Sequence, residues 1–460
     1  MAAAPTRILL RTTIKMNKRK PVLAAALALA IPMAAQAEGH GPIFGLATPT
    51  LGQGQWSSDT GFMHVQTQAG DTWSAREMLG YGITEDLQLT LTAPIDQGDQ
   101  DVGMANTRGG AMMGAPDAVE ASMLWRFHRN APAIGMRRES SLLVGVADGA
   151  ELGNSNLDIG PTLHAAVVTG FASRTTYWWL GAGVQHDVGR ARVEQGDLTY
   201  ATAVFGWRPP VFRGDYPKPD WRLFAEAVAE HAERDRVGGM RMENSGGTRV
   251  LAGPSVLGLF GRWGVSAGVL LPVDEQLNGL QPDTDYRAKF VFTYWFYRSE
   301  IMKTILKPML VLALLGAPGI ALAQGLLHAK QTIFGMDCAP CAYGIEQGLK
   351  GLPGVKSVKV SLNDGYAEVT LAPGSVTSMA QIREVIIDNG FTPKQAHVEL
   401  EGRLTLAPTP QLIAGKTRYP LALGSGTDAT AGQRVKLTGV ISADTLQVQV
   451  ENVEPLPAQG

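Results

Sequence analysis

Between residues 38 and 296, apolar and polar side chains alternate along short stretches, and no sustained helical period is present. Residues 87–93 read LQLTLTA, and residues 263–271 read WGVSAGVLL, with apolar side chains at every second position. A period of two residues is typical of β-strands. This segment is therefore predicted to be built from strands.

In residues 221–230, WRLFAEAVAE, the charged side chains Arg222, Glu226 and Glu230 share one strand face, and the opposite face is apolar. A soluble sandwich also alternates, with its apolar faces meeting in a core. In a membrane barrel the sense is inverted, because apolar side chains face lipid and polar ones face the lumen. Alternation by itself fits both arrangements.

Three features favour the membrane barrel: tryptophans near predicted strand ends, a glycine-rich polar face, and an alternating final stretch, YRAKFVFTYWF, that ends on Phe296. Such a barrel requires aromatic residues at both membrane interfaces. The tryptophans concerned are Trp178, Trp179, Trp207, Trp221, Trp263 and Trp295.

The final stretch resembles the C-terminal strand of bacterial outer-membrane proteins, which close on a terminal Phe. Residues 40–62 and 80–95 are also similar to outer-membrane proteins described as transporters associated with metal resistance or aromatic catabolism. The resemblance implies an outer-membrane antiparallel β-barrel over residues 38–296. With the even strand number expected of such barrels, we predict about twelve strands.

The chain carries two segments with the order of a secretory signal peptide: basic residues, an apolar run and a small-residue site. The first starts at Met16 and ends with Ala-Gln-Ala at residues 35–37, which makes residues 1–15 an upstream extension. The second starts at Met302 and ends with Ala-Leu-Ala at residues 321–323. A transmembrane helix is the alternative for the second, but a span needs about 20 apolar residues, and this run is shorter.

Composition narrows the function classes. A chain of 460 residues suits two or three domains, and 40 basic against 42 acidic residues give no indication of nucleic-acid binding. The chain has two cysteines, Cys338 and Cys341, which excludes a disulfide scaffold. The six histidines and the Met-containing loop of the barrel segment lack ligand spacing, so we assign no metal site there.

After the second signal, the pattern changes to strands alternating with helices. A short strand precedes the loop Gly-Met-Asp-Cys-Ala-Pro-Cys at residues 335–341, and the helix that follows has Ile345, Leu349 and Leu352 on one face. Two strands joined by an Asn-Asp-Gly turn at 363–365, a second helix and a further strand complete the order βαββαβ. This order predicts an α+β ferredoxin-like domain.

The cysteine pair offers two sulfur ligands on a loop that we expect to face solvent, with Cys341 at a helix N-terminus that stabilises its thiolate. Two soft ligands favour Cu(I), whereas zinc requires four ligands. A Cys-x-x-Cys pair is also compatible with a thioredoxin-like redox pair or with a structural disulfide.

The Gly-Met-x-Cys-x-x-Cys motif between the first strand and the first helix resembles the heavy-metal-associated domain. With its own signal, the segment is similar to periplasmic mercury-binding proteins. The resemblance implies that Cys338 and Cys341 are thiolate ligands for Cu(I) or Hg(II), and that Gly335 and Met336 support the loop, with Met336 packed beneath it. Many family members carry Thr or a small residue where Asp337 stands, and a carboxylate there would oppose thiolate formation.

The last segment consists of short alternating stretches separated by Gly, Asp and Ser turns, which predicts a small OB-like β-barrel. It lacks the basic groove and stacked aromatics of proteins that bind single-stranded nucleic acid, so we interpret it as an accessory domain.

The expected domains are as follows: an extension and signal peptide (1–37), the outer-membrane barrel (38–296), a junction with the second signal (297–323), the heavy-metal-associated domain (324–399) and the small β domain (400–460).

These features predict heavy-metal handling in the cell envelope, with residues 38–296 in the outer membrane and residues 324–460 in the periplasm. The expected partners are a soft metal ion, outer-membrane lipid and periplasmic or inner-membrane metal-transfer proteins, with no nucleic acid. No catalytic constellation stands out, so we predict that the protein is not an enzyme. The alternative is a thiol-disulfide oxidoreductase tethered to the barrel.

The second signal predicts that two exported proteins have been joined. Because signal peptidase cuts after small-residue sites, mass spectrometry of the expressed protein is expected to find one fragment beginning at Glu38 and another beginning at Gln324. An intact chain through residue 323 in the cell envelope would contradict this and would indicate a tethered two-part protein.

Overall fold

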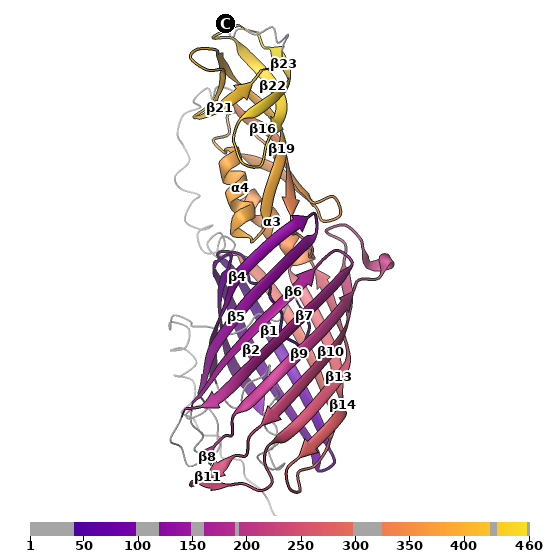
Figure 1. Ribbon diagram of the computed structural model, residues 1–460. Helices are drawn as coiled ribbons and strands as arrows, with labels where there is room; N and C mark the ends of the chain where they lie inside the picture. The colour runs from indigo at the N-terminus through magenta and orange to yellow at the C-terminus, as the bar shows by residue number, and fades with distance from the viewer. Residues whose placement is uncertain are drawn as a thin grey trace, which may run out of the picture.

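The computed structural model describes residues 41–97, 119–148, 161–188, 193–297, 324–423 and 430–457. Both predicted signal segments lie outside these ranges, as do Met104, Met112 and Met113 of the Met-containing loop. Among the residues that are described, none of the helices is long and apolar enough to cross a membrane. Figure 1 shows a long β-barrel with a smaller C-terminal unit, residues 324–457, standing on one end of it.

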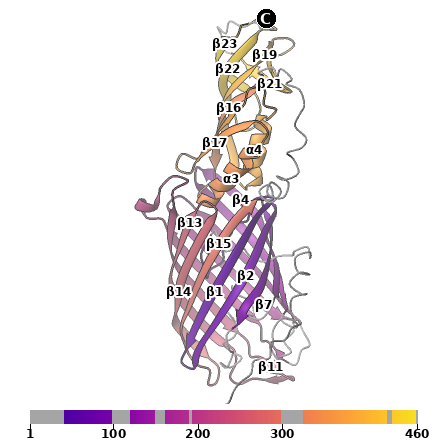
Figure 2. The same cartoon turned by 180° about the vertical axis from the view of Figure 1, so that it is seen from behind.

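The larger part is a closed antiparallel barrel of 12 strands. Around the barrel, each strand pairs with its neighbour in sequence order, and β1 pairs with β15 to close the ring (Figure 2). The predicted strand number is therefore confirmed. The barrel strands are β1 (Gln55–Thr67), β2 (Gly70–Thr84), β3 (Leu87–Gln97), β4 (Val119–Ala133), β5 (Met136–Asp148), β6 (Thr162–Ala172), β7 (Thr176–Asp187), β9 (Leu198–Trp207), β10 (Asp220–Ala232), β13 (Gly247–Phe260), β14 (Trp263–Leu277) and β15 (Thr284–Tyr297).

The pattern of buried and exposed side chains is that of a membrane barrel. On β10, Arg222, Glu226 and Glu230 are buried inside, whereas Leu223 is exposed outside. Along β9, buried and exposed positions alternate without interruption. Since the charged face of β10 points inward and its apolar face outward, this strand matches the arrangement of barrels that face lipid.

The aromatic prediction is correct for part of its set. Trp178, Trp207 and Trp263 are exposed on the outer surface, as an interfacial girdle requires. Trp179 and Trp295 are fully buried, so the prediction is wrong for these two. The reason is the strand period: Trp179 follows Trp178 directly, and successive side chains point to opposite faces.

The segment that precedes β1 lies inside the barrel. The backbone N–H groups of Ile43, Phe44 and Gly45 donate to the carboxylate of Glu226 at 3.0, 2.8 and 2.7 Å. Lys289 Nζ donates to the carbonyl of Ile43 at 3.1 Å. The polar inner wall therefore satisfies the backbone of an extended segment that has no strand partner of its own.

The two ends of the barrel differ in their connections. At the end where β1 begins and β15 finishes, most connections are tight turns, such as residues 134–135 between β4 and β5. One connection at this end is longer, residues 208–219 between β9 and β10, and it contains the 3-10 helix η3 (Pro210–Phe212). The opposite end carries the longer connections and a small sheet of β8 (Val193–Glu194), β11 (Arg236–Val237) and β12 (Met240–Arg241). The C-terminal unit stands on the short-turn end (Figures 1 and 2).

The first half of the C-terminal unit has the predicted ferredoxin-like order. Its elements are β16 (Gly325–Phe334), α3 (Ala339–Lys350), β17 (Val355–Ser361), β18 (Tyr366–Leu371), α4 (Met379–Asp388) and β19 (Thr392–Thr405). The sheet order is β17-β18-β16-β19. Ile345 and Leu349 of α3 are fully buried, as the helical period predicted.

Strand β19 continues from the ferredoxin-like sheet into a second, closed sheet, so residues 399 and 400, where we placed the domain boundary, both lie within it. The remaining strands of this sheet are β20 (Gln411–Ala414), β21 (Thr417–Ala422), β22 (Arg434–Ile441) and β23 (Val448–Pro455), and β22 closes it by pairing with β19. Arg383 of α4 donates to the carbonyls of Ser442 and Thr445 at 2.6 and 2.9 Å, which ties the two sheets together. The OB-like class of this small barrel stays a prediction.

The prediction that the outer face of the barrel contacts lipid can be tested by placing a charged side chain on that face. Leu180, near the middle of β7, is 54% exposed. Leu180→Arg is expected to lower the free energy of unfolding in lipid by about 2–4 kcal/mol, the cost of a basic side chain at the bilayer midplane. Urea titration in vesicles, followed by heat-modifiable migration on a gel, measures the change. Leu180→Ala is the control, and equal stability of the Arg and Ala variants would contradict a lipid-facing β7.

Candidate metal centre

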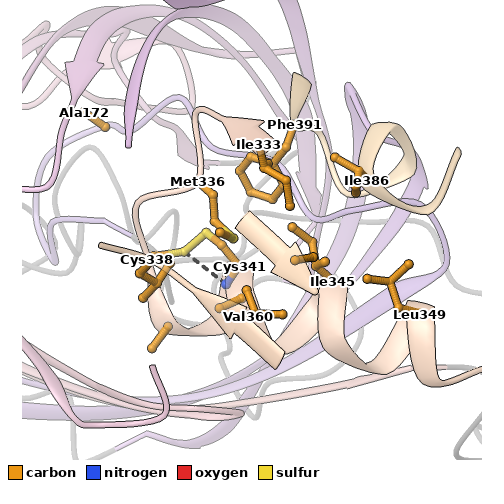
Figure 3. Close-up of a cluster of buried hydrophobic side chains, with 14 of the residues drawn as sticks. Ala172, Ile333, Met336, Cys338, Cys341, Ile345, Leu349, Val360, Ile386 and Phe391 are labelled. Carbon is orange, nitrogen blue, oxygen red and sulfur yellow. Dashed lines mark hydrogen bonds between the residues drawn. A yellow bond between two sulfur atoms is a disulfide. The ribbon is translucent and has the colours of Figure 1, made fainter. Parts of the chain in front are cut away.

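The loop that joins β16 to α3 is shaped by two residues that the motif includes. Gly335 has φ +89°, a backbone conformation that residues other than glycine rarely adopt. Met336 is fully buried, and Figure 3 shows its side chain next to the cysteine pair, on the side of Ile333 and Phe391. The loop therefore leaves the strand through a residue in the left-handed conformation, and the buried apolar side chain of Met336 packs against it.

Both cysteines belong to the first turn of α3. Cys338 is the N-cap residue, and its Sγ accepts the backbone N–H of Cys341 at 3.2 Å. The two Cα atoms are 5.1 Å apart, and the sulfurs are joined in a disulfide. On reduction, both sulfurs would stand at the positive end of the helix dipole, which stabilises thiolates.

The cysteine pair is covered by the barrel. Cys338 is 0% exposed and Cys341 is 9% exposed, and Ala172 of β6 belongs to the same buried cluster (Figure 3). The backbone N–H of Gly335 also donates to the carbonyl of Ala133, the last residue of β4, at 3.2 Å. Our expectation of a solvent-facing loop is therefore wrong, because the short-turn end of the barrel packs over it.

Asp337 lies among arginines that the barrel supplies. Its carboxylate forms ion pairs with Arg137 at 3.0 Å and Arg222 at 3.5 Å. Its backbone carbonyl accepts from Arg208 at 2.8 Å and from Arg222 at 3.3 Å. We call Arg137, Arg208 and Arg222 the arginine cluster. Its positive charge offsets the carboxylate that would otherwise oppose ionisation of the neighbouring thiols.

Arg208 lies just beyond the end of β9. Burial, together with the nearby charge of Arg222, lowers the pKa of Arg208 to about 10. At neutral pH the guanidinium therefore stays charged. It also forms an ion pair with Asp220 at 2.7 Å, and Arg222 shares that same carboxylate at 3.1 Å.

Within the described ranges, one group of three or more potential metal-ligating side chains comes together: Asp337, Cys338 and Cys341, whose ligand atoms lie within 4.8 Å of one another. Two of the described barrel histidines pair with carboxylates away from this group. His64 pairs with Asp71 at 3.1 Å, and His186 pairs with Asp197 at 2.7 Å. The site assigned from the sequence and the only candidate site in these ranges are therefore the same.

Comparisons with known proteins agree with this site. Residues 332–392 match the family model of the heavy-metal-associated domain and form such a domain. Human copper-transporting ATPase 2 is 30% identical over 144 residues, which is 30% of this chain and 9% of that protein. The rat protein of the same name is 32% identical over 124 residues, 27% of this chain and 8% of that protein. This chain thus spans less than a tenth of the length of either relative.

Two solved structures are similar to the barrel. The COG4313 outer membrane channel from Pseudomonas putida F1 aligns with a TM-score of 0.40 and 11% identity, over 55% of this chain and 100% of that one. The NanC porin aligns with a TM-score of 0.33 and 5% identity, over 52% and 98%. The class of the barrel rests on its closed antiparallel sheet and its inward charges. The chain thus combines an outer-membrane-type barrel with a heavy-metal-associated domain.

The arginine cluster was not predicted from the sequence. The strand pattern places Arg222 on a charged face, but no local signal groups that residue with Arg137 and Arg208. The three residues come from β5, from the connection after β9 and from β10, and barrel closure brings them together. Asp337, the departure from the family motif, was the one local signal that a partner was needed.

The conformation of the loop can be tested at its glycine. Gly335→Ala is expected to destabilise the loop by about 1–2 kcal/mol, the cost of a left-handed conformation for a side-chain-bearing residue. Its Cβ would also stand 3.2 Å from that of Ala131. Amide hydrogen exchange of residues 332–392 in the full chain should become faster. Gly351→Ala, at φ −75°, is the control, and equal exchange in both variants would contradict the role of Gly335.

Proposed function

We propose that the protein handles a soft heavy metal in the cell envelope. In this proposal, the reduced Cys338–Cys341 pair binds one Cu(I) ion as cargo, and the barrel provides a passage across the outer membrane. The observation that carries the proposal is the pair of sulfurs in the first turn of α3 within a heavy-metal-associated domain. The role is binding and transport rather than catalysis of a reaction.

The donor set favours Cu(I). Two thiolates satisfy a soft ion of low coordination number, whereas zinc takes four ligands. Asp337 is the nearest further donor, but its carboxylate is paired with arginines. Hg(II) suits the same two sulfurs, and the similarity to two copper-transporting ATPases supports copper.

The disulfide sets a condition on this function. A sulfur in a disulfide has no thiolate to offer a metal, so the pair must be reduced before it binds. Metal transfer would then proceed by exchange with thiols of periplasmic or inner-membrane partners.

The orientation of the chain follows from the barrel. Outer-membrane barrels place short turns in the periplasm and long loops outside. The C-terminal unit stands on the short-turn end, so in this proposal residues 324–460 are periplasmic and the outer face of the barrel contacts lipid.

A second function is favoured by the disulfide itself. The pair is oxidised in the structure, and a Cys-x-x-Cys disulfide at a helix N-terminus is the arrangement of thiol-disulfide oxidoreductases. In that function the pair would exchange electrons with other thiols and would hold no metal.

Metal titration separates the two functions. The reduced full chain is expected to bind about one Cu(I), because Cys338 and Cys341 are its only thiols. Cys338→Ser or Cys341→Ser should abolish tight binding, measured by competition with a chromophoric Cu(I) chelator. Thr370→Ser, at an exposed position of β18, is the control.

Unchanged stoichiometry in the double Ser variant would exclude this metal site. Absence of Cu(I) binding in the reduced wild type, combined with rapid exchange with a dithiol, would favour the oxidoreductase.

A further inference from the structure

The contact between the barrel and the C-terminal unit is made by charged and polar groups at defined positions. The arginine cluster receives Asp337, as described above. A second contact comes from the connection between β9 and β10, residues 208–219, which is the longest at this end of the barrel. We call residues 209–219 of this connection the mouth arm, since Arg208 belongs to the arginine cluster.

The mouth arm binds the turn that follows β17. The carboxylate of Asp215 accepts from the Ser361 hydroxyl at 2.8 Å and from the backbone N–H groups of Leu362 and Asn363 at 2.7 and 3.2 Å. Three donors on one carboxylate make a specific, charge-assisted contact. The backbone N–H groups of Leu362 and Asn363 therefore have their acceptor in the barrel, whereas the Ser361 hydroxyl also lies 3.3 Å from the carboxylate of Asp364 in its own domain.

The next residue of the arm reaches α3. The Tyr216 hydroxyl donates to Glu346 at 2.5 Å, and its ring packs against the buried apolar cluster. Burial and the bond to Glu346 raise the pKa of Tyr216, so the phenol stays protonated and keeps its donor. The arm thus contacts the C-terminal unit on the turn and on the helix.

Charge balance shows why the mouth requires a carboxylate. Arg208 and Arg222 share Asp220, and the carboxylate nearest to Arg137 on its own strand, Glu139, lies 3.7 Å away while it pairs with Arg126 at 2.7 Å. Asp337 is fully buried, and it is the group from the C-terminal unit that adds negative charge to the arginine cluster. A buried charge without a partner is strongly destabilising.

We propose that the short-turn mouth of the barrel is a docking site for the C-terminal unit, with Asp337 as the recognised carboxylate and the mouth arm as the second contact. Docking holds the unit in place even when the chain is cut between residues 297 and 324. The description of the docked loop as metal-binding rests on the proposed function, whereas the docking itself does not.

Docking and metal exchange are alternative states of the unit. In the docked state Cys338 is fully buried and Cys341 is 9% exposed, so a partner thiol cannot contact both sulfurs. Exchange with another protein therefore requires that the unit leave the mouth. The barrel therefore competes with partner thiol proteins for the loop that carries Cys338 and Cys341.

The first experiment asks whether docking survives cleavage. A protease site is placed within residues 298–323 of the full chain, with an affinity tag on the barrel. After cleavage, the wild-type C-terminal unit should stay bound, and Asp337→Lys should weaken binding about 30-fold or more, as for loss of a buried charged partner. Glu451→Lys, an equal charge change on exposed β23, is the control and should stay bound.

The second experiment uses the intact chain. After reduction, alkylation of Cys338 and Cys341 is timed in the wild type, Asp337→Asn and Asp215→Asn. Both variants should react faster, by about tenfold for Asp215→Asn, the value of a lost charge-assisted contact. Asp215 is remote in sequence from the cysteines, so its effect separates docking from a direct influence of Asp337 on the thiols.

Release of the wild-type unit on cleavage, retention of the Asp337→Lys unit, or an unchanged alkylation rate in Asp215→Asn would each overturn the docking proposal. None of these measurements uses a metal. Persistent docking with no Cu(I) binding would therefore refute the proposed metal function and leave the docking site standing.

Discussion

Closure of the barrel is the constraint on which the rest of this structure depends. A strand in lipid has no water to satisfy its backbone, so every edge must be paired. Here β1 and β15 supply the closing pair, with Gln55 opposite Tyr297. Since the first and last strands of an even-stranded barrel meet at one rim, the segment before β1 and the chain after β15 leave from the same end. That geometry sets the C-terminal unit beside the short-turn mouth.

Closure also fixes what the interior must contain. The inward face of the strands carries charged side chains among apolar ones, and because these charges are buried, each requires a partner. Glu226 finds partners in the backbone of residues 43–45. At the mouth, the arginine cluster has more positive charge than Asp220 balances, and Asp337 of the C-terminal unit adds a second negative charge. The same electrostatic requirement therefore acts along the lumen and at the mouth.

In the proposed function, the loop that carries Cys338 and Cys341 must meet two requirements that oppose each other. Ligand exchange requires sulfurs that a partner can reach, whereas burial of Asp337 against the barrel covers them. Asp337, which the motif alone presented as a disadvantage for thiolate formation, lies where the arginines neutralise it. An arginine-rich environment and a helix N-terminus both lower the energy of a thiolate. In the docked state, the charges around the cysteine loop favour thiolate formation, but the barrel blocks access of a partner to the sulfurs.

The sequence by itself determined the strands of the barrel, the βαββαβ order and the cysteine pair at the head of α3. Those features depend on side-chain periodicity, turn residues and spacing over a few positions, all of which are local. Only the tertiary structure decided that Trp179 and Trp295 face inward, that β19 runs through the expected domain boundary, and that the cysteines are covered. Asp337 meets Arg137 and Arg222 across long stretches of chain. No local pattern encodes that meeting, because it arises only when the barrel closes and the C-terminal unit packs on its mouth.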